Sequence, residues 1–328
     1  MMISVLIATR DRAALLAATL DALAQQEALG QPVEIVIVDN GSTDDTPAVV
    51  ARARERGAAP VIYLREERPG KSHALNTALS HIRGDLLVLT DDDVLPSPGW
   101  LAAYVRAFEM SDTDFVVGRI LPLWEAPPPR WMSPALYGVL AVPDGGTRSL
   151  FIARGLNEHI MPLGANMAIR RSVVDRIGGW SPDLGKLEGT LRTGEDHEFG
   201  LRMLAAGFRG RYEPEACVRH RVAADRLRLG YFRKWFYDNG KIEAQLDRPY
   251  PTTNRYVFGV PGYLWRQAAI DVSSGLVGLG TCDWARAAAG QMRALWFAGF
   301  LCERWGTRRN KQPAAVPVRG AIEARRWQ

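Results

Sequence analysis

The stretch GDLLVLTDDDVLPSPGW, residues 84–100, places three consecutive aspartates directly after an apolar run. Carboxylates this close together repel one another, so they stay ionised only where a cation or hydrogen-bond donors offset their charge. Side chains at alternate positions of an extended segment point the same way, so Asp91 and Asp93 can face one divalent ion while Asp92 points elsewhere. Oxygen ligands with no cysteine nearby suit Mg²⁺ or Mn²⁺. The alternative is a polar turn, because aspartate is common in turns and PSPG is typical of a loop.

The apolar run before the aspartates is one of several short strand-like segments that alternate with amphipathic helical patterns. We expect strands at residues 3–9, 33–39, 60–66 and 85–91, and helices at residues 12–26, 46–57 and 71–82. Apolar strands without polar alternation, separated by helices, are typical of a mostly parallel sheet with helices on both faces. The sequence therefore predicts an α/β fold.

Three of these strands end in polar clusters: Thr9-Arg10-Asp11, Asp39-Asn40-Gly41-Ser42 and Asp91-Asp92-Asp93. Ligands of such sheets bind at the carboxyl ends of the strands, so the three clusters should share one edge. Thr9 or Asp11 could instead cap the helix that follows. Asp39 lies at the last strand position, too early to cap, and its oxygens should face the edge, where a nucleobase imide or a ribose hydroxyl could donate to them.

A glycine and a lysine, Gly70 and Lys71, open the third predicted helix. A helix N-terminus beside a lysine favours anions, so Lys71 and Arg68 are candidates to reach a phosphate. The GxxxxGK[ST] pattern is absent, which excludes a P-loop. A solvated lysine is the alternative.

The second half of the chain supplies four further candidates. Glu195 and Asp196 fall in the first turn of an amphipathic helix, where carboxylates stabilise the helix dipole, and one that faces the site could act as a general base. His220 follows a short strand-like stretch and is either a metal ligand or a structural histidine. Asn166, in GAN, either lines the site or satisfies a turn.

The composition bounds the class of protein. The chain has 328 residues, and 41 Lys and Arg against 36 Asp and Glu give a net charge of +5. This fits an anionic small molecule, an anionic membrane surface or nucleic acid equally well. The three cysteines lack CxxC spacing, which predicts reduced thiols and a cytoplasmic location. No signal peptide and no apolar run of the roughly 18 residues that span a bilayer are present, so we expect no integral membrane segment.

Taken in order, six motifs resemble the inverting nucleotide-sugar glycosyltransferases of family 2, which have the GT-A fold, a Rossmann-like α/β sheet. The motifs are SVLIATRDR, IVIVDNGSTDDT, GKSHALNTAL, LTDDDVLPSPGWL, LGANMAIRR and GEDHEFGLRMLAAGFR with a later histidine, and they cover about residues 3–222. The resemblance implies metal-dependent inverting transfer of a sugar from a nucleoside diphosphate donor, a UDP-sugar, to a hydroxyl of a glycan or lipid-linked acceptor. It implies no nucleic-acid partner.

The resemblance also assigns roles to the candidate residues. Asp91 and Asp93 form the DxD pair that binds Mn²⁺ or Mg²⁺, and His220 is a third metal ligand. Asp196 is the general base, with Glu195 beside it at the acceptor. The residues implied to bind the donor are Thr9, Arg10, Asp39, Lys71, Asp91, Asp92 and Asn166. Inversion needs a carboxylate near the acceptor hydroxyl and a cation near the departing diphosphate, and the two acidic clusters match these roles.

The catalytic domain is expected at residues 1–222, with a donor half at about 1–118 and an acceptor half at about 119–222. The acceptor half opens with a loop rich in Pro, Trp and Gly, residues 119–151. Trp124 and Trp131 in this loop could stack on a sugar ring or pack the loop.

Residues 223–312 are expected to form helices that interleave aromatic and basic side chains. Such helices suit the surface of an anionic membrane, here the cytoplasmic face of the inner membrane, or they pack on the catalytic domain or a second subunit of a homo-oligomer. The basic tail, residues 313–328, is expected to be flexible.

Three other functions compete with a glycosyltransferase. A sugar-nucleotide-forming nucleotidyltransferase would carry a Gly-rich loop after the first strand, which ATRDRAALL lacks. A non-catalytic nucleotide-sugar-binding module would be expected to lack the base or the acidic pair, and both are present. A dinucleotide-dependent dehydrogenase is disfavoured because no GxGxxG follows the first strand.

Overall fold

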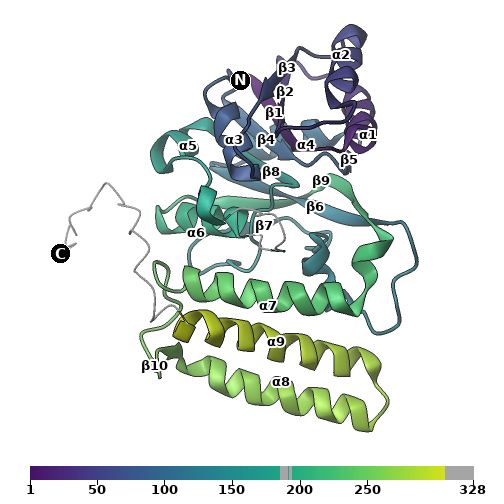
Figure 1. Cartoon of the computed structure of the whole chain (residues 1–328). Coiled ribbons are helices and arrows are strands. Elements are labelled where there is room, and N and C mark those ends of the chain that lie inside the picture. Colours follow the sequence, from purple (N-terminus) through teal and green to yellow (C-terminus); the bar gives the residue numbers. More distant parts are fainter. Residues whose placement is uncertain (185–190, 192–193, 307–328) are drawn as a thin grey trace, which may run out of the picture.

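The computed structural model describes residues 1–184, 191 and 194–306, and forms an α/β body above a layer of C-terminal helices (Figure 1). The first part of the chain contains β1 (Ile3–Thr9), α1 (Ala13–Ala24), β2 (Val33–Asp39), α2 (Thr46–Arg56), β3 (Val61–Arg65), α3 (Lys71–Leu79), β4 (Leu86–Thr90), β5 (Val94–Pro96) and α4 (Trp100–Met110). The middle contains β6 (Phe115–Trp124), the 3₁₀ helix η1 (Pro134–Leu140), β7 (Leu150–Ile152), β8 (Asn166–Arg170), α5 (Arg171–Ile177), η2 (Pro182–Leu184), α6 (Glu195–Ala205), β9 (Gly210–Val222) and η3 (Ala224–Leu227). The last part contains α7 (Leu229–Leu246), β10 (Tyr256–Val257), β11 (Val260–Pro261), α8 (Gly262–Gly280) and α9 (Trp284–Gly306).

The main sheet has the strand order β3-β2-β1-β4-β8-β6-β9-β5, with β7 added on β9. Strands β1 to β4 are mutually parallel, as the alternating pattern predicted. Strand β8 runs antiparallel to both of its neighbours, β4 and β6, and β9 runs parallel to β6. The α/β fold is confirmed, and the carboxyl ends of β1, β2 and β4 meet at one edge.

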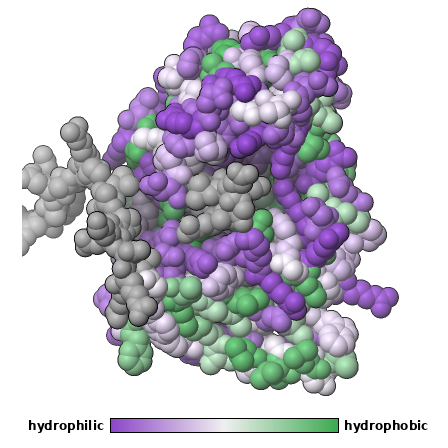
Figure 2. Space-filling view, in the orientation of Figure 1, coloured by the Kyte–Doolittle hydropathy of each residue, from purple (hydrophilic) through white to green (hydrophobic). Residues whose placement is uncertain are grey.

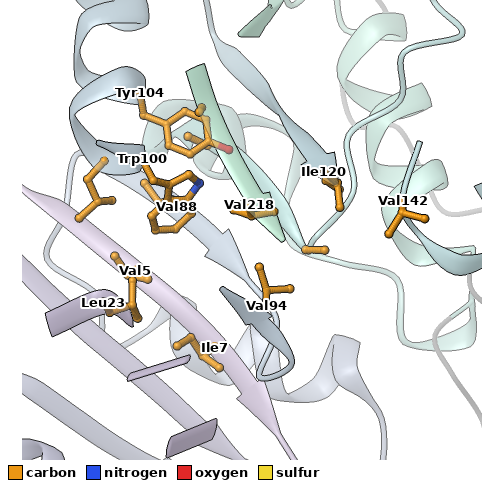
Figure 3. Packing of buried hydrophobic residues seen from close by; sticks show 14 of the residues in the cluster. Val5, Ile7, Leu23, Val88, Val94, Trp100, Tyr104, Ile120, Val142 and Val218 are labelled. Atoms are coloured by element: carbon orange, nitrogen blue, oxygen red, sulfur yellow. The ribbon is translucent and has the colours of Figure 1, made fainter. Parts of the chain in front are cut away.

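Both faces of the sheet are buried, which explains why its strands lack polar alternation. On one face Val5 and Val88 pack with Trp100 of α4 (Figure 3). On the other face Leu6 packs in a second cluster with Phe199 of α6. Burying a side chain of this size contributes about 1.5–3 kcal/mol, so helices on both faces hold the sheet edge in place.

Strand β9 is longer than the short strand expected before His220. It pairs with β5 so that His220 lies opposite Val94, the residue that follows the three aspartates. The segment after the aspartates is therefore a short strand that leads into the PSPG loop. This register brings His220 from the second half of the chain to the aspartate cluster.

The C-terminal helices form their own layer, in which α9 lies between α7 and α8 (Figure 1). A small cluster of buried apolar side chains, which includes Phe300 of α9, joins these helices. Across residues 1–184, 191 and 194–306, no helix combines the length and the apolar character that a membrane span needs. The predicted tail, residues 313–328, lies outside the described residues.

Candidate functional site

The central aspartate of the triplet, Asp92, is buried and holds the neighbouring loop in place. Its carboxylate accepts hydrogen bonds from the hydroxyl of Thr9 at 2.7 Å and from the guanidinium of Arg12 at 2.9 Å. The same Arg12 nitrogen reaches Asp93 at 3.0 Å. The hydroxyl of Thr19 donates to the backbone oxygen of Asp92 at 2.9 Å. Asp92 therefore ties the end of β1 and the start of α1 to the aspartate cluster.

The two outer aspartates have separate partners. Asp91 accepts a hydrogen bond from the ammonium of Lys71 at 2.6 Å. One oxygen of Asp93 faces Arg12, and the other lies 3.3 Å from Nε2 of His220. The sequence predicted that Asp91 and Asp93 share one ion, whereas the structure pairs Asp93 with His220 and Asp91 with Lys71.

Asp92 and Asp93 have pKa shifts of opposite direction. Burial raises the pKa of Asp92 to about 6, although Arg12 opposes this. Burial also acts to raise the pKa of Asp93, but the hydrogen bond and charge of His220, together with Arg12, outweigh it and hold that pKa well below its usual value. Asp93 is thus the carboxylate of the pair that stays anionic to lower pH.

Asp93 and His220 are suitable ligands for a divalent cation. His220 is 3% exposed, and its Nδ1 has no hydrogen-bond partner among the described residues. Carboxylate oxygen and imidazole nitrogen are ligands that Mn²⁺ accepts, and diphosphate oxygens commonly complete the coordination of such ions. Within the described ranges no three His, Cys, Asp or Glu side chains form a metal-binding group, so protein side chains alone would not complete the shell.

A second acidic pair, Glu195 and Asp196, lies in the first turn of α6. The backbone N–H of Gly164 donates to Asp196 at 2.8 Å. The other Asp196 oxygen and one oxygen of Glu195 are buried without a hydrogen-bond partner among the described residues. A Cβ on Gly164 would lie 2.9 Å from Nζ of Lys71 and 3.0 Å from Asp196 Oδ2. The ammonium of Lys71 and the carboxylate of Asp196 therefore both lie against the backbone of Gly164.

Both carboxyl groups of the second acidic pair, Glu195 and Asp196, have raised pKa values. Burial, followed by the charge of Asp196, raises the pKa of Glu195 to about 7. Burial also raises the pKa of Asp196, while Lys71 and the Gly164 N–H oppose the shift. Burial acts to lower the pKa of Lys71, but the carboxylates of Asp91, Asp196 and Glu195 outweigh it and raise that pKa above its usual value. Lys71 is therefore the cation between the two acidic groups.

Asp39 lies at the same edge but points into the protein. It is fully buried, and its carboxylate accepts hydrogen bonds from the backbone N–H of Ser42 at 2.7 Å and from the hydroxyl of Tyr63. The bond to Ser42 closes the turn after β2, a structural role different from the helix cap that the sequence excluded. Asp39 thus has fewer free acceptor positions for a ligand than the sequence suggested.

Two arginines lie exposed at this edge. The Arg10 side chain is 50% exposed and lies 3.7 Å from Asp11. The Arg68 side chain is 65% exposed and pairs with Glu66 at 2.7 Å. Both guanidinium groups are open to an anionic ligand.

The start of α1 is capped from another loop. The backbone N–H of Ala13 donates to Asp44, which lies in the β2–α2 loop, at 2.8 Å. Thr9 and Asp11, the two caps considered from the sequence, make other contacts: Thr9 donates to Asp92, and Asp11 accepts from the backbone N–H of Thr43 at 2.7 Å. These bonds join the loops that follow β1 and β2.

Asn166 begins β8, and its side chain lies in the core. Its side chain is fully buried, and it accepts from Trp100 and Tyr104 and donates to the backbone oxygens of Arg119 and Ala216, at 2.7–2.9 Å. These bonds join β8 to α4 and to the irregular pairing of β6 with β9. The donor-binding role that the sequence indicated for Asn166 is therefore not retained.

The tryptophans of the loop at residues 119–151 contact other aromatic rings. The ring of Trp124 meets Tyr137 edge-on at 5.3 Å, and that of Trp131 meets Phe232 edge-on at 5.0 Å. Both contacts fit the packing role considered from the sequence. Each ring is still partly exposed.

Sequence reasoning missed three contributors to this site: Arg12, Tyr63 and Gly164. Arg12 could have been identified from the sequence. It is a cation three residues after the end of the first strand, at an edge of the sheet that was predicted to be acidic. Gly164 and Tyr63 could not have been identified in this way, since their partners lie at least 24 positions away along the chain.

The family model for glycosyl transferase family 2 matches residues 4–178. A pre-mycofactocin glycosyltransferase of Mycobacterium tuberculosis is 29% identical over 207 residues, which are 63% of this chain and 41% of that protein. The succinoglycan biosynthesis protein ExoU of Rhizobium meliloti is 30% identical over 205 residues, which are 58% of this chain and 53% of that protein. The chain thus spans less than two thirds of the length of either relative.

Solved structures of glycosyltransferases share the fold. A mannosyltransferase of Pyrobaculum calidifontis, in complex with GDP-Man and Mn²⁺, superposes with a TM-score of 0.64 at 22% identity, covering 93% of this chain and 87% of that one. S. aureus TarS 1–349 in complex with UDP superposes with a TM-score of 0.53 at 17% identity, covering 93% and 92%. The fold is therefore of the GT-A type, and the chain belongs to glycosyl transferase family 2.

Proposed function

We propose that the protein is a metal-dependent inverting glycosyltransferase that moves a sugar from a UDP-linked donor to a hydroxyl of a glycan or lipid-linked acceptor in glycoconjugate biosynthesis. The observation that carries the proposal is the division of the site into two acidic groups with different chemistry. The pKa of Asp93 is held low beside His220, and one buried oxygen of Asp196 has no hydrogen-bond partner among the described residues. Lys71 lies between the groups, bonded to Asp91.

Asp93 and His220 are the proposed ligands of Mn²⁺ or Mg²⁺. When bound, the cation would offset the charge that develops on the departing diphosphate. Arg12 and Thr9 hold this part of the site through Asp92. The structural relatives solved with GDP-Man and Mn²⁺, or with UDP, support a nucleotide donor of this kind.

Three exposed or partly exposed cationic side chains and one buried acid are the candidates to contact the phosphates, ribose and nucleobase of the donor. Arg10 and Arg68 are placed to approach phosphate or ribose oxygens from solvent. Lys71 is 24% exposed and could donate to a phosphate oxygen beside Asp91. Asp39 would reach the nucleobase only through a rearrangement of its bonds to Ser42 and Tyr63.

Asp196 is the proposed general base. An acceptor hydroxyl loses its proton as the new bond forms, so the base must be ionised and within hydrogen-bond reach of that hydroxyl. Of the acidic pair, Asp196 is oriented by the Gly164 N–H, and the ammonium of Lys71 lies against the same glycine. Burial raises the pKa of both acids, that of Glu195 to about 7, so the choice of Asp196 rests on its bond to the Gly164 N–H.

The proposal is tested by the release of UDP from a panel of UDP-linked hexoses in the presence of Mn²⁺ and candidate glycan and lipid-linked acceptors. With the acceptor that supports turnover, Asp196→Asn should lower the rate by about 10²–10⁴-fold, the usual contribution of a general base. The matched control is Asp175→Asn, which changes an exposed carboxylate on α5 and should leave the rate unchanged. A rate for Asp196→Asn within tenfold of wild type would exclude Asp196 as the base.

A further inference from the structure

Large apolar side chains are exposed very unevenly over the molecule. Of the 15 that the described residues expose, 11 lie between residues 256 and 305. Figure 2 shows hydrophobic residues gathered at the lower end of the molecule, where α8 and α9 lie. The part formed by Ile270, Val272, Leu276, Val277, Leu279 and Trp284 is called the α8 face below. Contiguous apolar surface of this kind usually marks an interaction site.

The α8 face exists because α8 buries its small residues and exposes its large ones. Gly275 and Gly278 point towards α9, where a Cβ on Gly278 would lie 2.6 Å from the backbone of Ala287. Leu276 and Leu279, by contrast, are 64% and 56% exposed. A surface helix normally buries its large apolar side chains, so this reversed pattern leaves the face without a partner in the chain described.

The charges around the α8 face are mainly basic. The acid of α8, Asp271, is buried and paired with Arg293 at 3.1 Å. Arg266 and Arg286 are exposed near the two ends of the face, and one exposed acid, Asp283, lies beside Trp284. The sequence that follows α9, residues 307–328, adds six Lys or Arg and one Glu. This distribution is complementary to an anionic surface and unfavourable for two copies packed face to face, which would bring the arginines together.

The apolar surface continues towards the catalytic part of the chain. A groove of about 470 Å³, mostly apolar, is lined by four residues of the α8 face together with Trp131 and Leu229. Trp131 belongs to the loop that follows β6, and Leu229 is the first residue of α7. A partner lying along the α8 face would therefore also meet this loop.

We propose that the α8 face inserts into the headgroup region of an anionic bilayer, with α8 parallel to the membrane plane. A helix of 19 residues with one apolar face and a basic rim fits an interfacial position. Tyr263 and Trp284, both exposed, lie near the ends of the face, where aromatic rings favour the membrane–water interface. The inference does not depend on the reaction that the protein catalyses.

The test is co-sedimentation of the full-length protein with vesicles of 70% phosphatidylcholine and 30% phosphatidylglycerol, compared with pure phosphatidylcholine. We expect binding to the anionic vesicles, weaker binding at high salt, and a loss of about tenfold or more in the partition coefficient for the double variant Ile270→Glu, Leu276→Glu. The matched control is Met110→Glu, which alters a methionine that is 74% exposed at the end of α4 and should bind as wild type does. Near-UV circular dichroism and the melting temperature establish that the variants remain folded.

Two results would overturn the inference. One is wild-type protein that stays in the supernatant with anionic vesicles at low salt. The other is a folded double variant that binds as well as wild type. Sedimentation equilibrium adds a further check: a dimer that the same substitutions dissociate, without vesicle binding, would assign the α8 face to a second copy of the chain.

Discussion

Lys71 and Asp91 form a hydrogen-bonded ion pair of 2.6 Å between the start of α3 and the end of β4. The same ammonium approaches Asp196 at Gly164, so one cation serves both acidic groups of the site. Its charge lowers the pKa values of Glu195 and Asp196 against the effect of burial. Lys71 therefore favours the ionised form of the proposed base.

Replacing Lys71 should shift the pH dependence of the reaction. In Lys71→Met the pKa values of Asp196 and Glu195 rise further, because burial and mutual repulsion are no longer opposed. The acidic limb of the kcat/KM profile should therefore move to higher pH, and the rate at a fixed acidic pH should fall. The measurement is kcat/KM between pH 5 and 9. A limb that stays in place would show that Lys71 does not act on the base.

Arg12 should stabilise the fold by offsetting the charges of Asp92 and Asp93. Arg12→Ala leaves both buried carboxylates without this donor, so we expect a loss of about 1–3 kcal/mol in the free energy of unfolding at neutral pH. Mn²⁺ should restore part of the loss, because it supplies positive charge at Asp93. Urea unfolding with and without Mn²⁺ measures both effects.

The control for Arg12 is Arg56→Ala, which removes an ion pair with Asp21 at the surface. Both side chains of that pair are at least half exposed, and such pairs are worth less than about 1 kcal/mol. Equal losses for the two variants, or no effect of Mn²⁺ on Arg12→Ala, would contradict the role given to Arg12.

Glu195 should make the stability of the protein fall as pH rises. Its pKa is near 4.5 when unfolded and about 7 when folded, so folding takes up a proton between these values. The favourable contribution is complete below pH 4.5 and is lost as pH rises through 7, with a slope of up to about 1.4 kcal/mol per pH unit. Glu195→Gln should flatten this part of the curve and gain stability over wild type at pH 8. The free energy of unfolding is measured with urea from pH 4.5 to 8. If it depends on pH in Glu195→Gln as steeply as in wild type, Glu195 is not buried as an acid.

Replacing Asn166 should lower the free energy of unfolding and leave the binding of the donor unchanged. Asn166→Ala leaves the hydrogen-bonding groups of Trp100 and Tyr104 and two backbone oxygens without partners, which should cost about 3 kcal/mol or more. Below its melting temperature the variant should bind UDP with Mn²⁺ as wild type does. Weakened binding by a stably folded variant would return Asn166 to the donor site.

The parts of the fold and site that the sequence predicted are those encoded by local pattern. Apolar runs of β-branched residues marked β1 to β4, and the parallel arrangement placed Asp39 and Asp91 at one edge of the sheet. The position of Glu195 in the first turn of α6 also followed from periodicity. Each of these depends on neighbours within one element or on a general rule of sheet topology.

The remainder depends on contacts between distant residues. The approach of His220 to Asp93 follows from the pairing of β9 with β5, and the bridge from Arg12 spans 80 positions to Asp92. The bonds of Asn166 could not be predicted, because its four partners come from α4, β6 and β9. Residue type alone does not distinguish an amide that satisfies the core from one that contacts a ligand.

The central claim is that Asp93 holds the metal and donor whereas Asp196 acts on the acceptor. The most direct measurement is calorimetric titration of UDP in the presence and absence of Mn²⁺ for wild type, Asp93→Ala and Asp196→Asn. We predict Mn²⁺-dependent binding by wild type, a loss of at least about tenfold in affinity for Asp93→Ala, and an affinity for Asp196→Asn within about twofold of wild type. Binding that ignores Mn²⁺, or an equal loss in both variants, would contradict the account.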